Sequence, residues 1–325
     1  MQSFEWVDAT NLSEALDSLH DRSIFKAGGI DVLDRLKEGL DAPQRLVNLR
    51  NIRELKFVED SGNSLRLGPL MTLAEASEHP LVKQRFPVLA EACLMAATPQ
   101  IRNAATIGGN ILQRPRCWYF RQEDFPCLRK GGTRCFAQDG ENDYHAVFDN
   151  DICAIVHPST VAVAAVAYGA TVQLTSKKGK REVPLESIFV TPEKDVTREH
   201  SLADGELMTE IRLPSPAAGT RSAYTKLMEK QSFDWPVAEV AAVLDMAGSS
   251  VRNASIILGA AAPIPWRAKA AQEYLIGKPL NEETAAQAAR AAVEGATPLR
   301  DNHYKLRLIE VAVRRTLLNA GASHA

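Results

Sequence analysis

The pattern of apolar and polar residues changes its period several times along the first hundred positions. Apolar residues recur at helical spacing in residues 11–19 and 31–40, whereas residues 24–27 and 45–49 are short apolar runs typical of strands. This order of strand, loop, helix and strand predicts an α/β arrangement. The same criteria predict a strand at 64–68, a helix at 72–78 and one amphipathic helix at 81–95.

The periodicity vanishes between about Gln113 and Asp151, where Arg, Cys, Gly, Gln and Asn are dense. An irregular stretch of this length inside a compact domain is usually functional or disordered. Four cysteines within or beside it favour a function. Regular patterns then return and predict a helix at 160–169 and strands at 171–175, 181–184 and 206–213.

A segment rich in Pro, Ala and Gly at 214–220 indicates a domain boundary. Beyond it, three strand-like segments (223–228, 238–246, 251–260) are followed by three helical ones (268–275, 282–294, 302–318). Strands followed by helices predict a small α+β domain. We therefore assign residues 1–215 to a first domain, with an inserted loop at about 113–153, and residues 216–325 to a second.

The bulk composition excludes several classes of protein. A chain of 325 residues is long enough for two domains, and 45% hydrophobic with 24% charged residues is ordinary for a soluble protein. A net charge of −2 gives no basic excess for nucleic acid or an anionic membrane. Because residues 1–6 lack the start of a secretory signal and no apolar run approaches about 18 residues, we expect no signal peptide and no membrane insertion.

Four of the five cysteines form a group, Cys117, Cys127, Cys135 and Cys153, spaced C-x9-C-x7-C-x17-C, whereas Cys93 lies in an apolar helix and is expected to be a buried thiol. Nearby cations favour the thiolate form that binds metal. A chain without a signal peptide should meet a reducing compartment, which disfavours disulfides. The short knuckles of structural zinc sites are absent, but spacing alone leaves zinc and a [4Fe–4S] cluster comparable.

Two paired-glycine loops are the other candidate site. Residues 27–31 (Ala-Gly-Gly-Ile-Asp) follow a strand and open a helix, where backbone N–H groups and a helix N-terminus can hold a pyrophosphate, although a lone Gly-Gly is more often a turn. Residues 105–112 (Ala-Thr-Ile-Gly-Gly-Asn-Ile-Leu) form the second loop. Two such loops suggest a two-ended ligand, with phosphates on one and a flat ring against the other, since glycine permits close approach of backbone to ligand.

These motifs carry a family resemblance. Residues 27–31, the run 100–110 (Gln-Ile-Arg-Asn-Ala-Ala-Thr-Ile-Gly-Gly-Asn) and residues 224–226 (Tyr-Thr-Lys) together resemble the flavoprotein subunit of the xanthine dehydrogenase family, and residues 259–267 are similar to its C-terminal motif. That family includes carbon monoxide dehydrogenase medium subunits, aldehyde oxidoreductases and 4-hydroxybenzoyl-CoA reductase. The resemblance covers almost the whole chain. It implies an α+β fold: a two-part FAD-binding domain of the vanillyl-alcohol oxidase/CO dehydrogenase flavoprotein type, then a small domain with a three-stranded antiparallel sheet.

The inserted loop resembles a subset of that family, in which it holds a [4Fe–4S] cluster in addition to two [2Fe–2S] clusters on a separate small subunit. The spacing looks closest to the periplasmic aldehyde oxidoreductase type. The resemblance implies that Cys117, Cys127, Cys135 and Cys153 are the cluster ligands.

The resemblance also implies which residues touch FAD. Residues 24–32 should wrap the pyrophosphate and ribose, the second glycine loop should touch the phosphates or the ring surroundings, and Lys226 should be a charge partner. The sequence departs from the family at Ile30, where Thr is common, and at Thr160, where Asp is common, which weakens a ribose contact. Lys226 as a solvated lysine and Met208 as core filler remain alternatives. The implied residues are Ile24, Phe25, Lys26, Ala27, Gly28, Gly29, Ile30, Asp31, Val32, Thr106, Gly109, Asn110, Leu112, Thr160, Met208 and Lys226.

The function implied is electron transfer within an oxidoreductase. A large partner subunit with a molybdenum cofactor oxidises the substrate, an aldehyde by the loop's spacing or else a purine or other heteroaromatic, and electrons pass through the clusters to FAD and an external acceptor. The protein positions the cofactor, so we expect no catalytic residue in this chain. His145 and His157 flank Cys153 closely enough to lie near the cluster, but we interpret them as surface residues. The turn at 232–236 is either a neighbour of the flavin or a purely structural turn.

Two other functions stay open. One is a stand-alone flavin oxidoreductase of the vanillyl-alcohol oxidase type, although the second domain offers little room for a substrate site. The other is a zinc-bearing assembly module. We expect a cytoplasmic location, or a periplasmic one by co-export with a partner that carries a signal.

Overall fold

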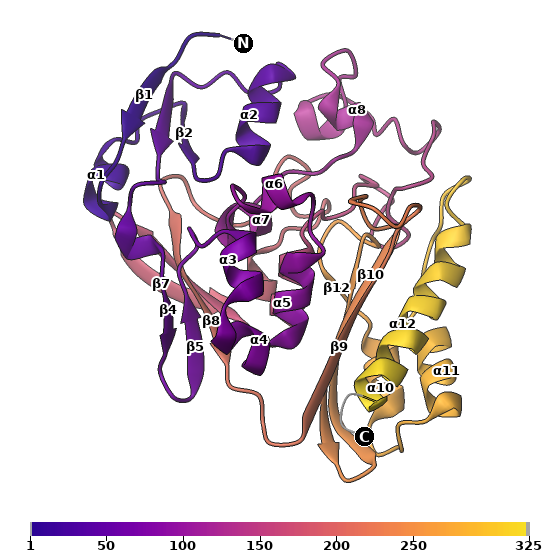
Figure 1. Cartoon of the computed structure of the whole chain (residues 1–325). Coiled ribbons are helices and arrows are strands. Elements are labelled where there is room, and N and C mark those ends of the chain that lie inside the picture. Colours follow the sequence, from indigo (N-terminus) through magenta and orange to yellow (C-terminus); the bar gives the residue numbers. More distant parts are fainter. Residues whose placement is uncertain (1, 323–325) are drawn as a thin grey trace.

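Three separate β-sheets organise residues 2–322, the part of the chain that the computed structural model describes (Figure 1). The first sheet has the order β1-β3-β2 and is parallel throughout, as the alternation of strand and helix predicts. Its elements are β1 (Glu5–Asp8), α1 (Leu12–Asp17), β2 (Ser23–Lys26), α2 (Ile30–Lys37) and β3 (Arg45–Asn48).

The second sheet has five antiparallel strands in the order β4-β5-β8-β6-β7, and a cluster of helices packs on it. Helix α9 is almost wholly apolar, and every one of its residues is buried, with α5, α7 and the C-terminal strands β10 and β11 packed against it. The elements are β4 (Val58–Asp60), β5 (Ser64–Leu67), α3 (Leu73–Glu78), α4 (Pro80–Arg85), α5 (Pro87–Leu94), α6 (Pro99–Arg102), α7 (Ile107–Ile111), α9 (Thr160–Ala167), β6 (Thr171–Ser176), β7 (Gly179–Pro184) and β8 (Leu207–Pro214), with 3-10 turns η1 (Arg53–Leu55) and η3 (Leu185–Ile188).

The prediction of a single amphipathic helix at 81–95 is wrong. The structure has two helices, α4 and α5, separated at Phe86. Proline has no backbone N–H and fits the first turn of a helix, so Pro87 begins a new helix instead of continuing the old one. Helix α5 is also buried over most of its surface, because it lies between α3 and the C-terminal sheet.

The third sheet has the order β12-β11-β10-β9, so a two-residue strand joins the three that the sequence predicts. Its side chains alternate between two cores: Ala241 and Ile257 belong to the core that contains α5 and α9, whereas Val240 and Leu258 belong to the core of the C-terminal helices. The sheet lies between α5 on one side and α12 on the other (Figure 1). The elements are β9 (Thr220–Leu227), β10 (Ala238–Ala247), β11 (Ser250–Gly259), β12 (Trp266–Arg267), α10 (Lys269–Leu275), α11 (Glu282–Ala291) and α12 (Tyr304–Ala322). Sharing one sheet between two cores fixes the C-terminal unit against the first domain.

The loop at 113–153 is ordered and has little regular structure, namely α8 (Trp118–Arg121) and η2 (Leu128–Lys130). Its end is fastened to the C-terminal unit, since the backbone N–H groups of Val147 and Phe148 both donate to the Ala261 carbonyl, at 2.8 and 3.1 Å. The loop therefore bridges the two parts of the chain.

No helix in the part of the chain described, residues 2–322, is both long and apolar enough to span a membrane.

Lys305 of helix α12 holds the end of the inserted loop against the C-terminal unit. Its ammonium group is fully buried and donates to the carbonyls of His145 and Ala260 at 2.8 and 2.6 Å, and to that of Tyr144 at 3.3 Å. Burial lowers the pKa of Lys305 to about 7. Three carbonyl oxygens would lose their donor if the ammonium group were removed.

We predict that Lys305→Met lowers the free energy of unfolding by about 2–4 kcal/mol, because buried acceptors without a donor are costly. Urea unfolding monitored by circular dichroism measures the change. Arg307→Met on the same helix replaces an exposed cation, and its effect should stay within about 0.5 kcal/mol. Equal losses in the two variants would contradict the assigned role of Lys305.

Candidate cofactor site

A cavity of about 790 Å³ lies where the first sheet, the helical layer and the C-terminal unit meet. This volume is within the range of about 300–1,000 Å³ typical of small-molecule sites. Its walls come from the loop 27–32, the segment 105–116, residues 197–208 and the turn 233–236. The cavity thus collects segments that lie far apart in the sequence.

The first glycine loop forms one wall because Gly28 lies directly against another backbone. A Cβ atom at position 28 would be 2.1 Å from the Ala104 carbonyl oxygen, so only glycine fits there. Gly29 has φ +87°, a left-handed conformation that also favours glycine, and it caps the N-terminus of α2. The first turn of α2 therefore presents free backbone N–H groups beside the cavity.

The second glycine loop forms the facing wall. Thr106 caps the short helix α7, and its Oγ1 accepts from the Gly109 backbone N–H at 3.2 Å. The Asn110 side chain accepts from Ser159 Oγ at 2.7 Å, which links this loop to the start of α9. Gly108 packs on Pro69, where a Cβ would be 2.7 Å from the proline ring. The loop is thereby held rigidly against its neighbours.

The structure brings together fifteen of the sixteen residues predicted for the FAD site, since all of them except Lys26 line this cavity. Lys26 instead donates to Asn48 Oδ1 at 3.2 Å and lies over the Trp6 ring. Thr160 reaches the cavity wall, but its hydroxyl contacts the Ala92 carbonyl at 3.4 Å. Residues 233–236 of the predicted turn also line the cavity.

The C-terminal sheet adds a buried polar group to the cavity wall. Lys226 lines the cavity and donates to the Met95 carbonyl at 2.9 Å. Directly opposite it on β10 is Glu239, 1% exposed, whose Oε2 accepts from the Tyr224 hydroxyl at 2.5 Å. Burial raises the pKa of Glu239 to about 7, although Tyr224 and Lys226 oppose the shift. Glycine at position 259 leaves room for this carboxyl group, because a Cβ there would be 2.1 Å from Oε1.

A second, smaller cavity gathers the four grouped cysteines from the inserted loop, with Phe120, Leu128 and Phe136 around them. Cys117, Cys127, Cys135 and Cys153 all line it, whereas Cys93 is buried elsewhere in the helical core, as predicted for a lone thiol. Cys135 and Cys153 interact directly; their contact lowers the pKa of Cys135 to about 6 and raises that of Cys153. The space between the thiols is about 10 Å³, and in residues 2–322 no three His, Cys, Asp or Glu side chains converge tightly enough for a metal ion.

The interpretation of His145 and His157 as surface residues is wrong. Both are 3% exposed. His145 lines the smaller cavity that holds the four cysteines, the thiol cavity, and its Nε2 lies 3.2 Å from Cys117 Sγ. Burial together with the Lys305 charge lowers the pKa of His145 to about 4. His157 packs edge-on against Phe189. Their burial follows from tertiary packing, which the sequence around Cys153 does not reveal.

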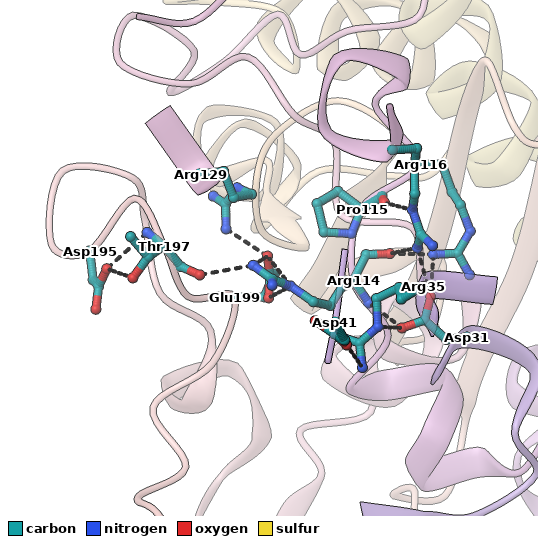
Figure 2. A network of polar contacts seen from close by, with 11 residues as sticks. Asp31, Arg35, Asp41, Arg114, Pro115, Arg116, Arg129, Asp195, Thr197 and Glu199 are labelled. Carbon is teal, nitrogen blue, oxygen red and sulfur yellow. Dashed lines mark hydrogen bonds and ion pairs between the residues drawn. The ribbon is translucent and has the colours of Figure 1, made fainter. Parts of the chain in front are cut away.

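A network of ion pairs connects the two cavities (Figure 2). Two of its carboxylates, Asp31 at the start of α2 and Glu199, which is 6% exposed, line the larger cavity and pair with arginines of the inserted loop. Burial opposes ionisation of each, but the adjacent arginines outweigh it and lower both pKa values. Arg114 and Arg116 line the same cavity. Sequence reasoning missed Glu199, Arg114 and Arg116; the density of arginine beside Cys117 was the available signal for the last two.

Two family models match the chain. The model described as the FAD binding domain in molybdopterin dehydrogenase matches residues 2–216, and that described as the CO dehydrogenase flavoprotein C-terminal domain matches residues 222–320.

Similar proteins are subunits of oxidoreductases. The FAD-binding subunit of an aldehyde oxidoreductase from Escherichia coli (strain K12) is 32% identical over 305 residues, which cover 92% of this chain and 91% of that protein. The medium chain of carbon monoxide dehydrogenase from Hydrogenophaga pseudoflava is 30% identical over 326 residues, covering 98% and 97%. A solved structure of carbon monoxide dehydrogenase from Hydrogenophaga pseudoflava superposes with a TM-score of 0.78 at 29% identity, covering 99% of this chain and 98% of that one.

The buried carboxyl group of Glu239 predicts a pH dependence of stability. The pKa of Glu239 is about 7 in the folded state, above the ordinary 4.5, so folding opposes ionisation of this carboxyl group. The neutral group's contribution to the free energy of unfolding is therefore fully present below pH 4.5 and is lost as the pH rises through 7. Glu239→Gln should therefore stabilise the protein at pH 8 by at most about 3 kcal/mol and change little at pH 4.5. Urea unfolding at both pH values measures this.

Glu283→Gln on the exposed start of α11 is the matched control for removing a carboxylate. A stability difference between wild type and Glu239→Gln that was the same at both pH values would contradict the prediction.

Proposed function

The chain belongs to the family of FAD-binding medium subunits of molybdenum hydroxylases, and from that premise we propose that it is the FAD- and [4Fe–4S]-carrying electron-transfer subunit of a heterotrimeric enzyme. Its partners are a large subunit with the molybdenum cofactor and a small subunit with two [2Fe–2S] clusters. The substrate is an aldehyde; the support is the cysteine spacing of the loop and the 32% identity to an aldehyde oxidoreductase subunit.

The observation that carries the FAD part is the pair of glycine loops facing one cavity, with Gly28 packed on Ala104. Free N–H groups of the first turn of α2 suit a pyrophosphate, since a helix N-terminus favours anions. FAD, when bound, accepts electrons singly and releases them in pairs. The chain's residues orient it: the loop 27–32 holds the dinucleotide, and Thr106, Gly109, Asn110 and Leu112 form the facing wall.

Lys226 is the cation of that wall, fixed in position by its bond to Met95. Met208, 1% exposed, fills the core behind the cavity as well as lining it. The turn at 233–236 lies at the cavity edge, with Phe233 and Trp235 more than half exposed. These aromatic side chains limit the access of water to the bound ring.

The support for a cluster is the chemistry of the donors. Four thiols and apolar or aromatic side chains share one small cavity, and no carboxylate lines it. Iron–sulfur clusters take thiolate ligands, and a multinuclear cluster holds them further apart than a single ion does. The Nε and Nη2 groups of Arg129, which lines the cavity, are buried without an acceptor among residues 2–322 and are available to cluster or cysteine sulfur.

The complex would work in the cytoplasm, or in the periplasm if a partner with a signal carries this chain across. Electrons would leave to an external acceptor.

Quantification of flavin, iron and sulfide in the purified chain after anaerobic reconstitution tests the proposal. We expect one FAD, four iron and four sulfide per chain. Flavin without iron would favour a stand-alone flavin enzyme, and zinc without flavin an assembly module; either result would overturn the proposal. Co-purification with two further subunits tests the partners.

We predict that Cys135→Ser loses most of the iron and the broad visible absorption, because three thiolates hold a cubane poorly. Cys93→Ala is the matched control, since Cys93 is a thiol in the helical core and not in the thiol cavity. Retention of full iron content by Cys135→Ser would remove Cys135 from the ligand set.

We predict that Gly28→Ala weakens FAD binding at least tenfold, because the added methyl group forces the first loop away from Ala104. Titration by the quenching of FAD fluorescence gives the Kd. Gly321→Ala, near the end of α12 and away from the cavity, should leave the Kd unchanged. An unchanged Kd for Gly28→Ala would show that the close approach is not required.

A further inference from the structure

Two carboxylates from outside the inserted loop join the loop to the flavin cavity, which is the larger cavity of about 790 Å³. Asp31 lies one residue after the start of α2, immediately behind the Gly28-Gly29 loop. Glu199 lies in the segment between η3 and β8. Each carboxylate lines the flavin cavity and also pairs with arginines of the loop, and Figure 2 shows these contacts.

Asp31 receives three donors from the first part of the loop. The Arg114 backbone N–H donates to Oδ2 at 3.1 Å, and the side chains of Arg116 and Arg121 both reach Oδ1 at 2.7 Å. All three residues lie within four positions of Cys117. The location of Cys117 is therefore tied to the first turn of α2.

Glu199 receives donors from two segments of the loop, one just before Cys117 and one just after Cys127. Arg114 Nε is 3.0 Å from Oε2, and Arg129 Nη1 is 2.7 Å from Oε1. The Arg129 side chain is 1% exposed and interacts with Cys153, and it lies two residues after Cys127. Arg129 lines the thiol cavity and not the flavin cavity, so Glu199 is its connection to the latter.

We propose that Glu199, through Arg114 and Arg129, makes the flavin cavity and the thiol cavity one cooperative binding unit, so that occupation of either site strengthens binding at the other. This inference rests on the proposed function, because it requires both cofactors. Glu199 and Arg129 are positioning residues: they act through the placement of Arg114 and of the cysteines. The ligand class recognised at the second site is a thiolate-bound iron–sulfur cluster.

The physical basis is the cost of ordering the loop. A long segment with little regular structure loses conformational entropy when it docks, and its arginines must dock opposite buried carboxylates. A cluster bound to the four cysteines of the loop restricts the loop before it docks, so less conformational entropy is lost on docking. FAD then binds to a wall that is already formed by Arg114 and Arg116. Linkage requires the effect to be reciprocal, with the same factor in both directions.

The experiment compares the FAD Kd of the full chain with and without its cluster. Iron-loaded and iron-depleted forms are prepared anaerobically from one purification, and the ratio of their Kd values is the coupling factor. We expect iron depletion to weaken FAD binding at least tenfold in the wild type. In Glu199→Gln the factor should fall to within twofold of one. Arg129→Gln should do the same and also weaken FAD binding to the loaded form, although Arg129 does not touch the flavin cavity.

Glu206→Gln is the control. Glu206 is another carboxylate of the flavin cavity, but it pairs with Arg181, outside the inserted loop. Any direct effect of Glu206→Gln on FAD binding is present in both the loaded and the depleted form and cancels in the ratio of their Kd values. The coupling factor of this variant should therefore equal that of the wild type. A variant that lost its fold would lose FAD in both forms and far-ultraviolet circular dichroism as well; Arg129→Lys, which keeps the charge, then supplies the test and should retain part of the coupling.

The outcomes separate this inference from the proposed function. A wild-type chain that takes up no iron would overturn the proposed function. A wild-type chain that takes up both cofactors with a coupling factor near one would overturn the inference alone. An undiminished factor in both Glu199→Gln and Arg129→Gln would also overturn it, since coupling would then follow another route.

Discussion

The larger cavity depends on one contact, the close approach of the Gly28 backbone to the Ala104 backbone. The two chain segments belong to different layers, and any side chain at position 28 would hold them apart, because its Cβ would be 2.1 Å from a carbonyl oxygen. The contact sets the distance between the two glycine loops. It also directs the first turn of α2 into the space between them, so the position of Asp31, and with it the docking of the inserted loop, follows from the same constraint.

The C-terminal unit closes the cavity at the cost of burying charge. Lys226 and Glu239 are 8% and 1% exposed on adjacent strands, and their side chains face the first domain, whose core also receives Ala241 and Ile257. An isolated buried charge is expensive, so these groups are bonded to Met95 and Tyr224. An apolar interface of equal area would hold the two parts together equally well. The polar pair instead places a cation on the cavity wall.

The sequence predicted most elements and the two glycine loops of the cavity wall, because both depend on local patterns and on motifs, whereas of the wall segment 197–208 it predicted only Met208. Glycine pairs, the cysteine group and strand alternation are visible in the chain, and the residues around them carried the family resemblance. The errors came from tertiary packing. Pro87 divides a helix whose apolar spacing is continuous, and the carbonyl of the buried His145 is bonded by Lys305, 160 positions away. Glu199 stands in an irregular segment without any pattern, so only the folded structure reveals that it faces two arginines of the loop.

The first part of the inserted loop is attached to the first domain chiefly by charge, and this has a consequence for assembly. Of its residues only Val147 and Phe148 enter a main hydrophobic core, and both lie near its end. The cores of the two domains are therefore complete without the segment that carries Cys117, Cys127 and Cys135. The Arg114 and Arg116 side chains are 21% and 22% exposed, and ion pairs that keep contact with water open at lower cost than a packed apolar interface. The domains can therefore fold while this segment is still undocked, after which docking against Asp31 and Glu199 brings the thiol cavity and the flavin cavity into register.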